Sequence, residues 1–177
     1  MVVGIALDDD QPRVVLSSFL STGDDRLSLE PYHVARDLPL AAAAAAVAEG
    51  RRRQEQLASA GLQGTIERLG RKPALAALLV NRAGWVTDLL SYSLAFAEHA
   101  AVADNLAVRE ALRGACRRCA LEIVEADETS LPDVAAQVLR LSPAEIKVRL
   151  KDLGATKPWR REQKLACLAA WLALARS

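Results

Sequence analysis

Two cysteines three positions apart are the first residues in this chain whose types and spacing could do chemistry. Cys116 and Cys119 enclose Arg117-Arg118, and flanking arginines can stabilise one thiolate of a C-x-x-C redox dithiol. The pair could also supply half of a zinc site, but Cys167 is the only other cysteine. We assign no metal ligands. A thiol oxidoreductase is therefore one alternative function, and packing of two small side chains on a helix is the interpretation that we favour.

A basic segment that contains a tryptophan is the second candidate. Residues 140–164 carry eight bases against three acids, whereas residues 1–40 carry seven acids against three bases. Basic residues with an interleaved aromatic ring can hold a nucleic-acid backbone and stack on a base. Taken alone, Trp159 is better explained as a hydrophobic staple for the last helix, and the charges are better explained as solvated helix faces. The residues predicted to bind nucleic acid are Lys157, Trp159, Arg160, Arg161 and Lys164.

Composition indicates a globular domain in a reducing compartment. The 177 residues are 51% hydrophobic and 25% charged, with a net charge of +1 and three cysteines. We expect a single domain over residues 1–177 with its own apolar core. The chain does not begin with a basic segment and an apolar stretch, and no apolar run approaches the ~20 residues that span a bilayer. We therefore expect a cytoplasmic protein with no membrane partner.

The residue pattern of the N-terminal half predicts strands followed by a long helix. Val2–Leu7 and Arg13–Leu20 are β-rich runs separated by a turn, and Arg26–Val34 alternates enough to be the third strand of an antiparallel meander. An alanine-rich helix is expected over about residues 40–60. The apolar run Ala74–Val80, bounded by a proline and an asparagine, favours a strand that is buried on both faces.

The C-terminal half is expected to be rich in helices. Thr87 can cap a helix that runs to about residue 122 with a break near residues 104–105, and residues 121–125 are either its end or a strand. Residues 136–141 are a further strand candidate. The run Ser-Pro-Ala-Glu at 142–145 has the pattern of a capping box, so we expect a helix from there and a last helix near the C-terminus.

Two sequence motifs connect this order of elements to a known fold. Residues 2–6 read Val-Val-Gly-Ile-Ala, and residues 141–147 read Leu-Ser-Pro-Ala-Glu-Ile-Lys, followed by Arg-Glu-Gln at 161–163. The motifs and the order of elements resemble the RuvC-like resolvase branch of the ribonuclease H-like fold. The resemblance implies an α/β fold with a mixed sheet, an N-terminal β-meander, flanking helices and a helix-rich C-terminal half. It also implies that residues 2–7 and 74–80 are neighbouring strands.

The resemblance implies a nuclease centre made of acidic side chains, and this chain lacks most of those acids. Such nucleases hold two divalent cations through acidic side chains, and Mg²⁺ requires oxygen ligands of this kind. Ala6 replaces the acid of the first strand, Asn81 follows the buried strand, and no acid follows Glu162 in the last helix. Asp8 is a weak catalytic candidate, because it lies two residues beyond Ala6 on the same side of the strand. We expect no cofactor, or Mg²⁺ if the chain is a nuclease.

We therefore predict a RuvC-related domain that acts by binding DNA, RNA, a protein partner or a second copy of itself. The alternatives are a metal-dependent nuclease with a non-standard carboxylate set and the C-x-x-C thiol oxidoreductase, so whether the chain is an enzyme stays open. His33 and His99 are interpreted as residues of helix surfaces. The sequence contains no glycine-rich phosphate loop and no serine-nucleophile motif.

Overall fold

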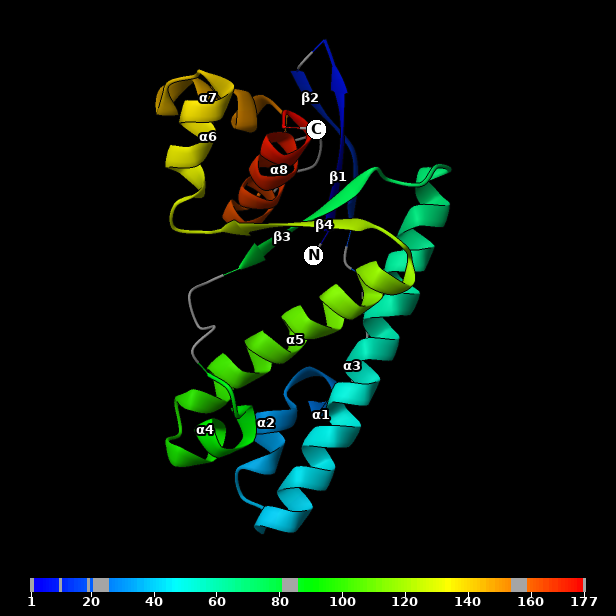
Figure 1. The fold of residues 1–177 in the computed structure, drawn as a ribbon, viewed down its shortest axis with the longest axis vertical. Coiled ribbons are helices and arrows are strands. Elements are labelled where there is room, and N and C mark those ends of the chain that lie inside the picture. The colour runs from blue at the N-terminus through cyan, green and yellow to red at the C-terminus, as the bar shows by residue number, and fades with distance from the viewer. Residues whose placement is uncertain are drawn as a thin grey trace. The chain divides into compact units, whose positions relative to one another are not determined.

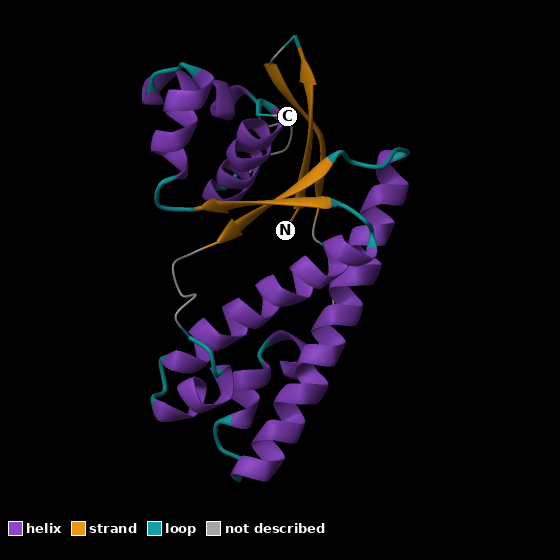
Figure 2. Cartoon of the chain, viewed as in Figure 1, coloured by secondary structure: helices purple, strands orange, loops and turns teal. Residues whose placement is uncertain are grey.

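The computed structural model describes residues 2–9, 11–18, 20, 26–80, 86–153 and 159–176. Within these ranges the chain is α/β and 62% helical, with eight helices, a two-stranded antiparallel sheet and a two-stranded parallel sheet (Figures 1 and 2). The α/β prediction is therefore confirmed. Among the described residues, no helix is both long and apolar enough to cross a bilayer.

The chain divides into two compact units, which we describe one at a time. Unit 1 comprises Met1–Phe19, Ile66–Asn81 and Leu121–Ser177. Unit 2 comprises Leu20–Thr65 and Arg82–Ala120. All of the described strands belong to unit 1, whereas the described elements of unit 2 are helices.

Unit 1 begins with a hairpin. β1 (Val2–Asp8) and β2 (Gln11–Ser18) pair antiparallel, which confirms the first two predicted strands. The predicted third strand over Arg26–Val34 is wrong, because these residues form the short helices α1 (Arg26–Leu29) and α2 (Pro31–Ala35) of unit 2. The proline lies in the first turn of α2, where its missing N–H breaks no helical hydrogen bond. The meander is therefore a two-stranded hairpin.

The second sheet of unit 1 consists of β3 (Leu75–Val80) and β4 (Glu122–Asp127), which run parallel. This confirms the predicted strand at 74–80 and shows that residues 121–125 lead into a strand rather than end a helix. The expected pairing of residues 2–7 with 74–80 is wrong for the described residues, because β1 pairs with β2 and β3 with β4. Both β1 and β3 instead pack against α8 (Arg161–Leu174).

α6 (Leu131–Leu139) replaces the strand that the sequence predicts over residues 136–141. Leu131, Ala135 and Leu139 recur every four residues and pack into the core of unit 1, which is the spacing of a helix face rather than of a strand. The helix ends at Arg140, whose φ of 54° lies in the left-handed region. Residues 136–141 alone are too few for the spacing of their apolar side chains to distinguish a strand from a helix.

The predicted capping box begins α7 (Pro143–Asp152) and is confirmed. The Glu145 backbone N–H donates to Ser142 Oγ at 3.2 Å, and the Ser142 backbone N–H donates to Glu145 Oε2 at 2.8 Å. α7 then packs with α6 and α8 in one hydrophobic core. The buried residues of this core are Leu131, Ala135, Ile146, Leu150, Cys167, Leu168, Ala169, Trp171 and Leu172.

Unit 2 is built around α3 (Leu40–Leu69), of which all but the last turn belongs to it. The helix is longer than the predicted span of about residues 40–60 and continues through Gly50. A Cβ at Gly50 would lie 2.5 Å from the Leu27 carbonyl oxygen of α1. The glycine therefore permits a close approach between the two helices, which compensates for its low helix propensity.

The last two helices of unit 2 are α4 (Leu89–Ala95) and α5 (His99–Arg118). Asp88, rather than the predicted Thr87, caps α4 by accepting the backbone N–H groups of Leu90 and Ser91. The break in the predicted helix lies at residues 96–98 and not near 104–105. Small side chains dominate the buried core, which consists of Tyr32, Ala35, Ala43, Val47, Ala100, Ala103 and Ala107.

Candidate nucleic-acid interface

α7 buries one side and exposes the other. Ile146 and Leu150 lie in the core one helical turn apart, whereas Lys147, Val148 and Lys151 are exposed, with Val148 retaining 58% of its surface. Because residues four apart share a helix face, the two lysines project from the same side. α7 therefore presents a basic surface that also contains an aliphatic side chain.

Trp159 joins the start of α8 to the end of α7. Its indole N–H donates to the Leu150 carbonyl oxygen at 2.7 Å, and its half-buried ring packs against the core of unit 1. Lys151 and Arg160 are the next residues after the two bonded positions, and both are exposed. The hydrogen bond therefore brings the basic start of α8 beside the basic end of α7.

Buried Gln163 fixes the first turn of α8. The Arg160 backbone N–H donates to Gln163 Oε1 at 2.7 Å, and Gln163 Nε2 donates to Ser17 Oγ on β2 at 3.0 Å. Gln163 lies in the third helical position, so its side chain satisfies an N–H group that the helix itself leaves without a partner. The position of the exposed arginines is thus set by a polar contact with the hairpin.

The residues predicted to bind nucleic acid differ in how far they are exposed. Arg160 and Arg161 are exposed, Lys164 is half-buried, and Trp159 is engaged in the packing described above. Lys157 lies outside the described residues. Packing of Trp159 agrees with the staple interpretation, so the cations rather than the indole ring are the groups that this surface offers to a ligand.

Sequence reasoning did not single out Lys147 and Lys151 as site residues. Their signal is present in the sequence: they alternate with Ile146 and Leu150 at helical spacing, on the helix that the capping box predicts. Nearby Arg149 is engaged inside unit 1, because its guanidinium donates to Gln11 Oε1 and lies 5.9 Å from the ring centroid of Trp171.

Glu145 is also engaged at the start of α7. Hydrogen bonds from the side chain and backbone of Ser142 lower the pKa of the Glu145 carboxyl group. The Glu145 carboxylate, two positions before Lys147, is therefore committed to the helix cap, where the positive end of the helix dipole stabilises its negative charge. Asp152, next to Lys151, is an exposed acid at the end of α7.

The acids of β1 do not fit a two-metal nuclease centre. Asp8 ends β1 with an exposed side chain that forms an ion pair with Arg13, with Nε and Oδ2 2.6 Å apart. Asn81 lies outside the described residues. Across the described ranges, no group of three or more His, Cys, Asp or Glu side chains is placed to hold a metal ion. We therefore derive no catalytic step through metal ions.

The three cysteines are free thiols in packed surroundings. Cys116 and Cys167 are buried and Cys119 is half-buried. Burial raises the pKa of the Cys116 thiol, and the neighbouring Cys119 raises it further. Burial raises the pKa of Cys167 to about 11. Because the thiolate is the nucleophile in thiol–disulfide exchange, burial and a raised pKa disfavour nucleophilic attack by Cys116 and by Cys167.

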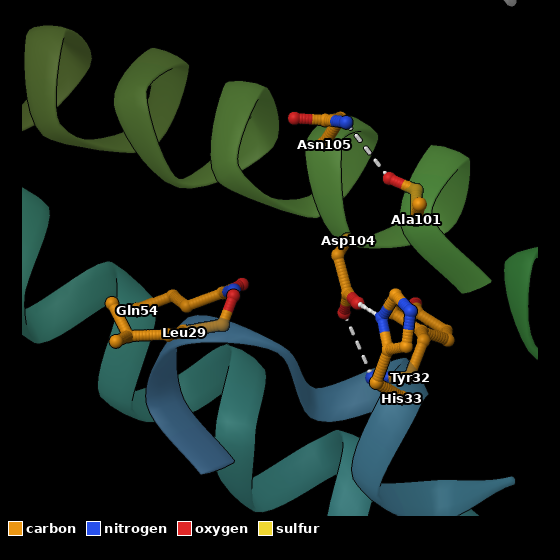
Figure 3. A network of polar contacts seen from close by, with 7 residues as sticks. All are labelled: Leu29, Tyr32, His33, Gln54, Ala101, Asp104 and Asn105. Atoms are coloured by element: carbon orange, nitrogen blue, oxygen red, sulfur yellow. Dashed lines mark hydrogen bonds and ion pairs between the residues drawn. The ribbon is translucent and has the colours of Figure 1, made fainter. Parts of the chain in front are cut away.

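A buried carboxylate organises the polar centre of unit 2 (Figure 3). Asp104 of α5 accepts the Tyr32 backbone N–H at 2.8 Å through Oδ1, and its Oδ2 lies 2.6 Å from His33 Nδ1. Burial raises the pKa of the Tyr32 hydroxyl, and the charge and hydrogen bond of Arg51 oppose this effect. The carboxylate thus holds the imidazole ring in one orientation between α2 and α5.

This histidine–carboxylate pair was not expected from the sequence. A carboxylate can orient a histidine as a general base, but here the same contacts also satisfy a buried acid and a backbone N–H. The partners are 71 positions apart, so spacing could not connect them. Asp104 did carry a local signal, because it stands beside Ala103 on the alanine-lined face of α5.

His99 is held by aromatic contacts at the start of α5. Its ring stacks on Tyr92 with centroids 3.9 Å apart, and Phe96 meets it edge-on at 5.0 Å. His99 Nδ1 lies 2.9 Å from the Tyr92 carbonyl oxygen. The residue is therefore half-buried and helps to fix the turn between α4 and α5, which differs from the helix-surface position that the sequence suggested.

No protein-family model matches this chain, and neither a curated protein nor a solved structure shows significant similarity to it.

Proposed function

We propose that this chain is a RuvC-related, ribonuclease H-like domain that acts by binding nucleic acid rather than by cleaving it. The order of an N-terminal hairpin, a later parallel strand pair and a last helix that packs against both β1 and β3 is compatible with this scaffold, whereas the pairing of β1 with β3 that the resemblance implies is not present among the described residues. The two sequence motifs at residues 2–6 and 141–147 point to the same family.

The binding part rests on one observation: exposed cations of two helices are gathered on unit 1. Lys147 and Lys151 project from α7, Arg160 and Arg161 begin α8, and the bond from Trp159 to Leu150 fixes one group beside the other. Lysine and arginine side chains bind phosphates and release the counterions that condense on nucleic acid. A surface of this composition fits a phosphate backbone.

The rest of the chain predicts that the affinity is modest. The net charge is only +1, and residues 1–40 hold seven acids against three bases, so long-range attraction to phosphate is weak. Dissociation constants on the order of 1–100 µM at physiological salt are typical of binding through phosphates alone. We expect a value in this range that weakens as salt rises.

Fluorescence anisotropy with labelled single-stranded, duplex and branched probes tests the proposal. Arg160→Ala with Arg161→Ala should lower the log–log salt slope by about 1.4–1.8, since each lost phosphate contact removes roughly 0.7–0.9. Arg52→Ala with Arg53→Ala is the matched control. It removes the same charge from α3, where both arginines bind Glu49, and should leave the slope unchanged.

Absence of binding to every probe at about 100 µM protein, the weak end of phosphate-driven affinities, would contradict the proposal. A slope that falls equally in both double variants would also contradict it, because the binding surface would then not be the one on α7 and α8. In either case a protein partner becomes the first alternative to test.

A further inference from the structure

We infer that α6 and α7 form a helix-turn-helix whose second helix, α7, binds in the major groove of duplex DNA. This inference rests on the proposed nucleic-acid binding and specifies its substrate. α6 (Leu131–Leu139) and α7 (Pro143–Asp152) are separated by three residues, 140–142. A turn of three or four residues between two helices is one feature of this motif.

The turn is built to be short. Arg140 adopts a left-handed backbone with φ 54° and ψ 41°, and its N–H donates to the Ala136 carbonyl oxygen, which ends α6. Ser142 then begins α7 at once through its capping box with Glu145. A left-handed residue at this point reverses the chain direction and is usually glycine. Here Arg140 adopts the left-handed conformation although it is not glycine.

The inner faces of both helices are anchored. Leu131 and Ala135 of α6 and Ile146 and Leu150 of α7 are buried in the core that α8 completes. Figure 1 shows α6, α7 and α8 gathered on one side of the strands of unit 1. α7 is therefore held rigidly from one side, which leaves its opposite side free to enter a groove.

The exposed face of α7 has a composition that suits base edges and phosphates. Ala144, Lys147, Val148 and Lys151 are exposed at i, i+3, i+4 and i+7, which is a single stripe along the helix that ends at the exposed acid Asp152, at i+8. Ten residues of helix extend about 15 Å, and the major groove is roughly 12 Å wide. Small aliphatic side chains contact thymine methyl groups there, and lysines contact guanine or phosphate.

The fixed position of Trp159 favours a duplex over a single strand. Proteins that hold single strands stack bases on exposed aromatic rings. The Trp159 indole donates to the Leu150 carbonyl oxygen and its ring packs on the core, and Trp171 is only 2% exposed. Among the described residues of unit 1, the tryptophans are thus committed to packing, while the α7 stripe is exposed.

The test compares a duplex of about 20 base pairs, roughly two helical turns, with each of its strands in the same anisotropy assay at low salt. The wild-type chain should bind the duplex more tightly than either strand. Val148→Glu places a negative charge in the centre of the stripe and should weaken duplex binding at least about tenfold. Val148→Ser is the matched neutral control and should weaken it much less. Thermal unfolding confirms that both variants are folded.

A second comparison tests the lysines. Lys147→Ala with Lys151→Ala should lower the salt slope for the duplex by about 1.8, whereas Arg71→Ala with Lys72→Ala removes equal charge from exposed positions before β3 and should not. Methyl green, a major-groove ligand, should compete with the chain for the duplex, and netropsin, a minor-groove ligand, should not.

The outcomes separate the two proposals. If the chain binds nucleic acid but prefers a single strand, or if Val148→Glu binds the duplex as the wild type does, the helix-turn-helix inference is overturned while the proposed function stands. If no probe binds at all, the proposed function fails and this inference fails with it. Duplex preference that is lost in Val148→Glu supports both.

Discussion

Asp104 is a buried acid at the contact between α2 and α5 of unit 2. Its carboxylate accepts the Tyr32 backbone N–H and contacts His33 Nδ1 while its side chain is only 9% exposed. A buried carboxylate is unfavourable unless its oxygens are hydrogen-bonded, and here both oxygens have partners. The contacts therefore stabilise the docking of α2 on α5 and also hold the imidazole ring in one orientation.

We predict that Asp104→Ala lowers the free energy of unfolding by about 1–3 kcal/mol, because it leaves a buried backbone N–H without an acceptor. Asn105→Ala is the control, since the adjacent Asn105 side chain is exposed and bonds only the Ala101 carbonyl oxygen in Figure 3; it should cost less than about 0.5 kcal/mol. Urea denaturation measures both values. Equal losses in the two variants would show that the carboxylate does not anchor α2.

At the residue scale, sequence reasoning succeeds where the partner is close in the chain. The capping contact between Ser142 and Glu145 spans three positions and was predicted, because side chains at this spacing meet at a helix start. The contact between His33 and Asp104 spans 71 positions. Nothing local specifies such a pair, since the packing of α2 against α5 brings its members together.

At the scale of elements, the residues that fold as predicted carry unambiguous local signals. The run Ala74–Val80 lies between helix-breaking residues and forms β3. The strands predicted over residues 26–34 and 136–141 were wrong, because each segment is short and the spacing of its apolar residues is compatible with both a strand and a helix. In residues 26–34, the proline is compatible with a helix start as well as with a strand edge. In residues 136–141, the helical spacing is visible only when Leu131 and Ala135, which precede the segment, are included.

Substitutions at Arg140 test whether the backbone of the turn between α6 and α7 is strained. A left-handed conformation costs a non-glycine residue about 1–2 kcal/mol, and glycine avoids this cost at the expense of greater chain entropy when unfolded. We predict that Arg140→Gly raises the free energy of unfolding by about 0.5–1 kcal/mol. Arg140→Ala removes the same charge without the backbone freedom and should give no gain.

Urea denaturation of the two Arg140 variants measures the difference. A gain in Arg140→Gly alone supports a strained turn whose geometry is imposed by the packing of α6 and α7. An equal gain in both variants would assign the effect to charge instead, since the exposed Arg140 lies in a segment with eight bases. No gain in either would show that the left-handed backbone is not strained.

At the scale of the whole molecule, the order of strand-like and helix-like segments was sufficient to predict the α/β class but not the arrangement of the sheets. The β1 and β3 strands were expected to pair with each other, and each has a different partner. Their joint packing against α8 depends on residues more than 80 positions away from β3, such as Leu168 and Leu172. Short-range patterns contain no information about such a contact, so the ribonuclease H-like scaffold stays a proposal.

The absence of nuclease activity is the prediction that belongs to the molecule as a whole, because a two-metal centre needs acids from several elements. Two cations about 4 Å apart must be held by a set of carboxylates, yet β1 supplies Ala6 in its middle and exposed Asp8, paired with Arg13, at its end. We therefore expect no cleavage of linear or branched DNA or of RNA in Mg²⁺ or Mn²⁺, measured on denaturing gels. Metal-dependent cleavage that disappears in Asp8→Asn but persists in Asp9→Asn would contradict this and restore the nuclease alternative with Asp8 as a metal ligand.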